Sequence, residues 1–152
     1  MGARGPATGD RAVVRSWSRS TVGSDYRRGV DAKALEERVR AICLALPEVT
    51  EKPSHGAPAF FVKKQFLILW SNGHHDHEFP HLWSAAPPGA QTDHIAADPK
   101  RFFRPPYVGG RGWVGLRLDG KVDWGLVEDL CEDAYRTIAP AKLIAVLDAD
   151  RT

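Results

Sequence analysis

The chain has 152 residues, of which 43% are hydrophobic and 26% are charged, and its formal net charge is +2. These values are typical of a soluble globular protein, and so small a charge does not by itself indicate nucleic-acid binding. The longest apolar run, Phe66 to Trp70, is too short to cross a bilayer, and the N-terminus lacks the apolar segment of a secretory signal. We therefore expect a cytoplasmic protein with no membrane association.

Residues 1–29 differ in composition from the rest of the chain. They contain Gly, Ser, Thr and Arg with few large apolar residues and no periodicity, so they cannot bury enough surface to order themselves. We expect a disordered or loosely attached basic tail. It is either an arm that contacts nucleic acid or an extension produced by a start codon placed too far upstream. Residues 30–150 are expected to form a single domain.

The first predicted helix begins at Asp31, whose carboxylate can accept hydrogen bonds from the free amides of the first turn. Pro47 ends it. Its apolar residues recur at helical spacing and form one stripe: Leu35, Val39, Ile42, Cys43 and Leu46. Residues 48–58 are predicted to be a polar loop.

Two short strands, 59–63 and 66–70, follow with only a few residues between them, which predicts a β-hairpin. The second is apolar on both faces, as in a central strand covered on both sides. A His-rich loop spans residues 71–80, and residues 82–85 are predicted to be a third strand. A short helix is expected over residues 90–97, and Phe102 and Phe103 are expected to be anchors in the core.

A Gly-rich segment, 109–112, leads into a predicted fourth strand that starts at Arg111. Side chains alternate along a strand, so Val114, Leu116 and Leu118 should point inward. The opposite row, Arg111, Trp113, Gly115 and Arg117, is basic and aromatic and suits an anion or a nucleobase. Arg104, Tyr107, Lys63 and Lys64 complete the candidate binding residues. The alternative is that Trp113 lies under a loop and the arginines are solvated.

The strongest helical pattern follows Asp123, which can cap it. Its apolar face is formed by Val127, Leu130, Cys131, Ala134, Tyr135 and Ile138. Pro140 then stops this helix or starts a second one. The two cysteines, Cys43 and Cys131, fall on apolar helical stripes, which favours free thiols in a reducing compartment, although a disulfide between them remains an alternative.

These elements predict an α+β fold, in which N- and C-terminal helices pack on a mostly antiparallel sheet in two layers. The sequence contains no GxSxG, HExxH or phosphate-binding loop, so we expect a binding protein rather than an enzyme. No catalytic residue and no cofactor is assigned. The alternative is a metal-dependent enzyme or metal-binding protein that uses the loop from His74 to His81, with His75, His77 and His81 as weak candidate ligands.

Three sequence blocks resemble the MmcQ/YjbR-like family of small bacterial proteins. They are Ala45 to Glu48 with His55 to Phe60, Ala86 to Gly89, and Phe102 to Leu116 followed by the acidic helix after Asp123. The resemblance implies a compact α+β fold of the double-wing DNA-binding or frataxin-like type. It implies no catalytic residues, because members are mostly of unknown function, although some are described as DNA-binding candidates. We expect a partner that is nucleic acid or a small anionic ligand, and a monomeric chain.

Overall fold

The computed structural model describes residues 23–151. Its first described element, α2 (Gly23–Leu44), begins well before Asp31, so the predicted N-cap at Asp31 is wrong. No proline lies between Gly23 and Asp31, and a single interior glycine such as Gly29 costs a helix only about 1 kcal/mol. The predicted boundary near residue 29 therefore falls inside α2. The rest of the predicted tail, residues 1–22, lies outside the described residues.

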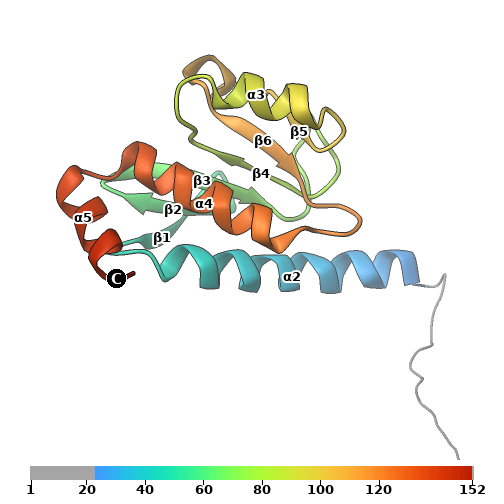
Figure 1. The fold of residues 1–152 in the computed structure, drawn as a ribbon. Coiled ribbons are helices and arrows are strands. Elements are labelled where there is room, and N and C mark those ends of the chain that lie inside the picture. Colours follow the sequence, from blue (N-terminus) through green and yellow to red (C-terminus); the bar gives the residue numbers. More distant parts are fainter. Residues whose placement is uncertain (1–22, 152) are drawn as a thin grey trace, which may run out of the picture.

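The described residues form one sheet of six strands in the order β1-β2-β3-β4-β6-β5, and every neighbouring pair is antiparallel (Figure 1). The strands are β1 (Thr50–Ser54), β2 (Ala57–Val62), β3 (Lys64–Trp70), β4 (His81–Ser84), β5 (Phe102–Phe103) and β6 (Val114–Arg117). β1 lies within the predicted loop 48–58, so that loop prediction is wrong. β1 is an edge strand of mostly exposed polar residues and contains Pro53, a residue type that is tolerated at a sheet edge.

The predicted hairpin is confirmed as β2 and β3, which turn at Lys63 with a positive φ of 70°. Its register contains an irregularity: Phe60 pairs with Leu67, but Phe61 pairs with Gln65. Phe66 is therefore an extra residue on β3, as in a β-bulge. Its ring lies edge-on to Tyr135 at 6.0 Å. Because of the bulge, Phe66 and Leu67 both point toward the helices. Side chains alternate again after it, so Ile68 and Trp70 point to the opposite face of the sheet.

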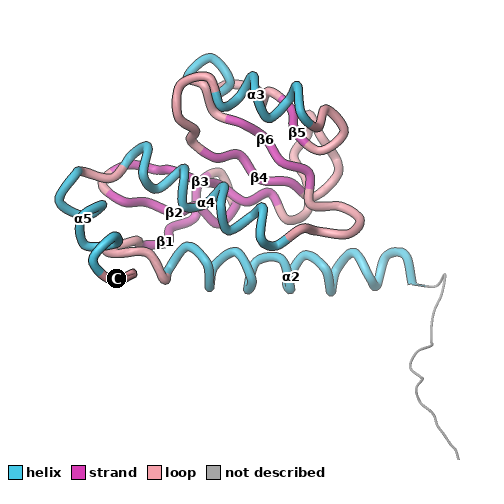
Figure 2. The backbone as a smooth tube through the Cα atoms, viewed as in Figure 1, coloured by secondary structure: helices cyan, strands magenta, loops and turns pink. Residues whose placement is uncertain are grey.

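Helices cover one face of the sheet (Figure 2). α4 (Trp124–Ile138) packs on β3 and β4 and also contacts α2, and α5 (Ala141–Ala149) follows after Pro140. The predicted cap is confirmed, because the Asp123 carboxylate accepts a hydrogen bond of 3.2 Å from the Leu126 amide. α3 (Ala90–Ala97) occupies its predicted residues and packs against β5 and β6.

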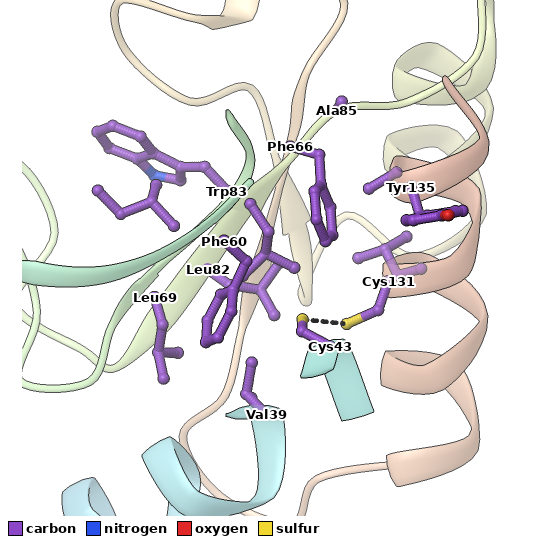
Figure 3. Close-up of a cluster of buried hydrophobic side chains, with 14 of the residues drawn as sticks. Val39, Cys43, Phe60, Phe66, Leu69, Leu82, Trp83, Ala85, Cys131 and Tyr135 are labelled. Atoms are coloured by element: carbon purple, nitrogen blue, oxygen red, sulfur yellow. Dashed lines mark hydrogen bonds between the residues drawn. The ribbon is translucent and has the colours of Figure 1, made fainter. Parts of the chain in front are cut away.

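The main core lies between this helical layer and the sheet. Figure 3 shows Val39 of α2, Phe60 of β2 and Leu82 of β4 gathered beside α4, with Trp83 on the opposite side of β4 from Leu82. Both cysteines are free and buried, and their Sγ atoms lie 3.9 Å apart. The fold is α+β, as predicted. Within residues 23–151, no helix has both the length and the apolar character needed to cross a membrane.

Candidate ligand-binding groove

The face of the sheet that points away from α4 carries a second, aromatic cluster. Trp70 of β3 and Trp83 of β4 lie 5.2 Å apart, measured between ring centroids. The imidazole of His74 packs against both indoles, at 4.6 Å from Trp70 and 5.2 Å from Trp83. The predicted His-rich loop thus folds back over the sheet instead of extending into solvent.

A groove of about 1160 Å³ opens beside this cluster. Its floor includes Ile68, Trp70 and Trp83, its walls include His55 of the β1–β2 turn and His74 and His75 of the His-rich loop, and Lys64 and Arg111 stand at its edge. None of its lining residues, all of them within the described part of the chain, is Asp or Glu. An aromatic floor with cations and imidazoles but no carboxylate favours an anionic, planar ligand.

The Pro-Pro-Tyr segment forms one wall of the groove. Tyr107 has a φ of 65° and is 75% exposed. Its hydroxyl lies 3.4 Å from Nε2 of His75, and its ring centroid lies 6.4 Å from that of Trp83. Positive φ at a bulky residue is uncommon and costs backbone energy. The backbone thus holds a large aromatic ring at the mouth of the groove, where a ligand can stack on it.

The segment before β6 differs from its prediction. Residues Gly109–Arg111 form a 3-10 turn, and Gly112 has a φ of 85°, so the strand begins at Val114 rather than at Arg111. Gln91 of α3 holds this turn, because its Nε2 donates to the carbonyls of Gly109 at 2.9 Å and Trp113 at 2.5 Å. The predicted alternation from Arg111 to Arg117 is therefore broken.

Trp113 is only 5% exposed, in agreement with the alternative that it lies under a loop. Its edge still lines the groove, and the Arg111 guanidinium lies 5.2 Å from its ring centroid, a cation–π contact. Arg117 is exposed but paired: it donates to both carboxylate oxygens of Asp119, at 3.0 and 2.7 Å, and lies over the ring of Phe79. It is not part of the groove lining.

The predicted binding residues therefore separate into two groups. Lys64, Tyr107, Arg111 and Trp113 line the groove, whereas Lys63, Arg104 and Arg117 do not. Arg104 instead packs its Cγ where a Cβ at Gly109 would lie, and its guanidinium donates to Gln91 at 3.3 Å. It supports the loop that carries Tyr107.

The predicted metal candidates also separate. Among the described residues, the one group of three or more His, Cys, Asp or Glu side chains with ligand atoms within 4.8 Å of one another is His74, His75 and Asp76. His77 and His81 lie apart from that group and pack against Phe103, at 4.6 and 5.5 Å between ring centroids. The structure does not bring His75, His77 and His81 together as one ligand set.

His81 belongs to the buried part of the aromatic cluster. It is fully buried, and its Nδ1 lies 2.7 Å from the carbonyl oxygen of Phe79. That contact assigns the proton to Nδ1 and leaves Nε2 as a lone pair, which is buried without a partner. Burial lowers the pKa of His81 to about 4, so the ring is neutral at physiological pH.

Sequence reasoning missed several groove residues. The sequence places His55 in a polar loop, Trp70 in a central strand and Trp83 in a short third strand, and it marks none of the three as a binding residue. One feature of the sequence could have identified two of the rings: Trp70 ends one strand, Trp83 lies in the next, and His74 lies in the loop that joins them, so the three rings come close if that loop folds back. The bulge at Phe66, which decides the facing of Ile68 and Trp70, has no clear sequence pattern.

The fold and groove together define a single-sheet α+β domain whose main helices cover one face, with an aromatic, cationic groove that runs along the other face and reaches the C-terminal end of α4. The YjbR family model matches residues 44–137, more than half of the chain. The chain belongs to the YjbR family, as the sequence predicted. No curated protein matches it.

One solved structure is similar. It is the crystal structure of the Deinococcus radiodurans protein DR2400, described as containing the domain DUF419. The two chains are 20% identical, the match covers 66% of this chain and 75% of that one, and the TM-score is 0.55. At this identity the similarity establishes the fold alone.

Proposed function

We propose that the groove binds a planar anionic ligand of the nucleotide type, either a stretch of single-stranded nucleic acid or a free nucleotide. The observation that carries this proposal is the composition of the lining. Two cations, three imidazoles and an exposed tyrosine surround an aromatic floor, and no carboxylate is present among these described residues. Such a surface attracts phosphate and offers rings for base stacking.

The dimensions of the groove support an extended ligand. Small-molecule sites usually measure about 300–1,000 Å³, and this groove, at about 1160 Å³, is larger. Its lining offers both Tyr107, on which a base can stack, and Lys64, which can pair with a phosphate. Arg111 can contact both parts of such a ligand, because its guanidinium lies over the Trp113 ring and can pair with phosphate at the same time.

Catalysis is not part of the proposal. The two cysteines lie in the core on the other side of the sheet, where burial raises the pKa of the Cys43 thiol well above its usual range, and such a thiol is a poor nucleophile. Thr137 is a hydroxyl residue of the groove lining, and its Oγ1 donates to a backbone carbonyl, that of Asp133 at 2.7 Å, rather than to a side chain that could act as a base.

Fluorescence anisotropy with labelled short single strands of DNA and RNA, and with a duplex of the same sequence, tests the proposal. We expect single strands to bind more tightly than the duplex. With two phosphate contacts, affinity for a single strand should fall about sevenfold between 50 and 200 mM salt. Competition by unlabelled mononucleotides distinguishes a free nucleotide from a strand as the ligand.

Variants locate the binding in the groove. Lys64→Gln and Arg111→Gln should each weaken strand binding and lower the salt slope by about 0.7. Tyr107→Asn, a residue that tolerates positive φ, removes a stacking ring and should cost about 1–3 kcal/mol. Lys142→Gln, an exposed lysine of α5 outside the lining, makes the same charge change as Lys64→Gln and should leave binding unchanged. Absence of binding at 50 mM salt, or equal losses in the Lys142 variant, contradicts the proposal.

A further inference from the structure

The loop after β3 brings three metal-ligating side chains together at the wall of the groove. It is closed by two reciprocal backbone hydrogen bonds between His74 and His77, of 2.8 and 2.9 Å. Gly73 permits the closure, because its φ is 87° and a Cβ there would lie 2.4 Å from the Glu78 carbonyl oxygen. The resulting tight loop turns the Asp76 carboxylate back toward the imidazoles of His74 and His75.

The distances within this group suit a metal ion. Oδ2 of Asp76 lies 3.7 Å from Nδ1 of His74 and 3.6 Å from Nε2 of His75. A tetrahedral zinc ion holds its nitrogen and oxygen ligands at about 2.0–2.2 Å, so those ligands are separated by about 3.4 Å. The two carboxylate–imidazole separations are within a few tenths of an ångström of that value, and the ligand atoms of all three residues lie within 4.8 Å of one another, so closure of this group around an ion would form a three-ligand site.

We propose that His74, His75 and Asp76 bind a divalent transition-metal ion of the zinc type at the wall of the groove. Neutral imidazole and carboxylate are ligands that zinc accepts, whereas magnesium and calcium prefer all-oxygen sites. This site goes beyond the nucleotide-type groove, because the free protein would bind the metal without any other ligand.

The surroundings hold the ligands in place. The His74 ring packs against the indoles of both Trp70 and Trp83, and such packing preorganises a metal ligand. Its Nδ1 receives only a long contact of 3.3 Å from the Asp76 amide, which a metal can displace.

Three protein ligands leave a zinc ion one open position, as in catalytic rather than structural sites. His74 and His75 both line the groove, and the Tyr107 hydroxyl lies 3.4 Å from Nε2 of His75. The open position is therefore available to water, to that phenol, or to an anionic oxygen of a molecule in the groove.

Calorimetry tests the site directly. The full chain, without an affinity tag and after treatment with a chelator, is titrated with zinc chloride at pH 7.5. We expect one-to-one binding with a dissociation constant in the micromolar range or tighter. Titration with cobalt(II) should produce the visible absorption bands of a tetrahedral nitrogen–oxygen complex, a readout that a simple His–Asp ion pair cannot give.

Variants assign the ligands. Asp76→Asn and His75→Gln change exposed residues and should each weaken zinc binding at least tenfold and abolish the cobalt bands. His94→Gln removes an imidazole that stacks on Phe102 at 4.5 Å, outside the group, and should bind zinc as the unaltered chain does. Circular dichroism confirms that each variant is folded.

The proposal is overturned by millimolar or multi-site heats, by cobalt spectra without tetrahedral bands, or by equal affinities in Asp76→Asn and the unaltered chain. Failure of the nucleotide-type proposal has a different signature. In that case Lys64→Gln and Arg111→Gln would show no effect on strand binding while zinc still binds one to one.

Discussion

The phenyl ring of Phe103 occupies the space that a side chain at Gly115 would take. A Cβ built on Gly115 would lie 2.4 Å from Cε2 of that ring. Gly115 pairs with Phe103 on β5 and with Trp83 on β4. Because Gly115 has no side chain, Phe103 can cover β6 beside His77 and His81, on the face that carries the groove.

Gly115→Ala should therefore destabilise the fold. The new methyl group must displace Phe103, and overpacking of this kind costs about 1–3 kcal/mol. Urea unfolding followed by tryptophan fluorescence measures the change. Gly125→Ala provides the control, because Gly125 lies in α4 and a Cβ there meets only Oδ1 of Asp123 at 3.5 Å, an ordinary van der Waals contact. A Gly115→Ala variant as stable as the Gly125→Ala variant would contradict the packing described for Phe103.

The buried His81 should make stability depend on pH. Its pKa in the folded state is about 4, below the ordinary value near 6.5 that it regains on unfolding. The unfolded chain therefore takes up the proton first as pH falls. The free energy of unfolding should therefore have its full value above about pH 6.5 and should decrease as the pH falls toward 4, by about 3 kcal/mol in total.

The measurement compares the urea midpoint of the unaltered chain with that of His81→Leu from pH 7.5 to pH 4.5. The variant is less stable at neutral pH because the Phe79 carbonyl loses its partner, but its pH slope should be shallower. Parallel slopes in the two proteins would show that other groups govern the acid transition.

Local patterns predicted much of the fold. The helix after Asp123 was predicted correctly because its stripe, its cap and its acidic outer face all agree, and the β2–β3 hairpin and the short helix over residues 90–97 followed from equally local patterns. β1 was missed for the opposite reason. Its residues are polar, mostly exposed and include Pro53, so nothing in them marks a strand; pairing with β2 and the ion pair between Glu51 and Arg40 of α2 order it.

The site was less predictable than the fold. Alternation along the strand correctly placed Val114 and Leu116 in the interior, but Gly112 adopts a left-handed conformation that ends the pattern one residue before Trp113. The groove depends on tertiary contacts between loops that are far apart in sequence, such as that between His75 and Tyr107. No periodicity in a single sequence encodes such a contact.

The Tyr135 hydroxyl should contribute to stability. It donates a hydrogen bond of 2.9 Å to the carbonyl of Pro47, and so ties α4 to the segment that follows α2. Tyr135→Phe leaves that carbonyl without this donor and should cost about 1 kcal/mol. Tyr107→Phe is the matched control, because it removes the same hydroxyl from an exposed ring. Equal midpoints for the two variants in urea would rule out this role for the buried hydroxyl.

The thiols of Cys43 and Cys131 should be inert while the protein is folded. Both are fully buried, their Sγ atoms lie 3.9 Å apart, and burial raises the pKa of the Cys43 thiol. Reaction with an aromatic disulfide reagent requires an exposed thiolate, so labelling at pH 8 should proceed only as fast as the protein opens. Both thiols should react at once in urea.

Because the reagent must reach the space between α2 and α4, the labelling rate of the folded chain should increase in variants that loosen that contact, such as Val39→Ala. Fast labelling of the folded, unaltered chain would mean that this part of the core opens far more readily than its packing implies.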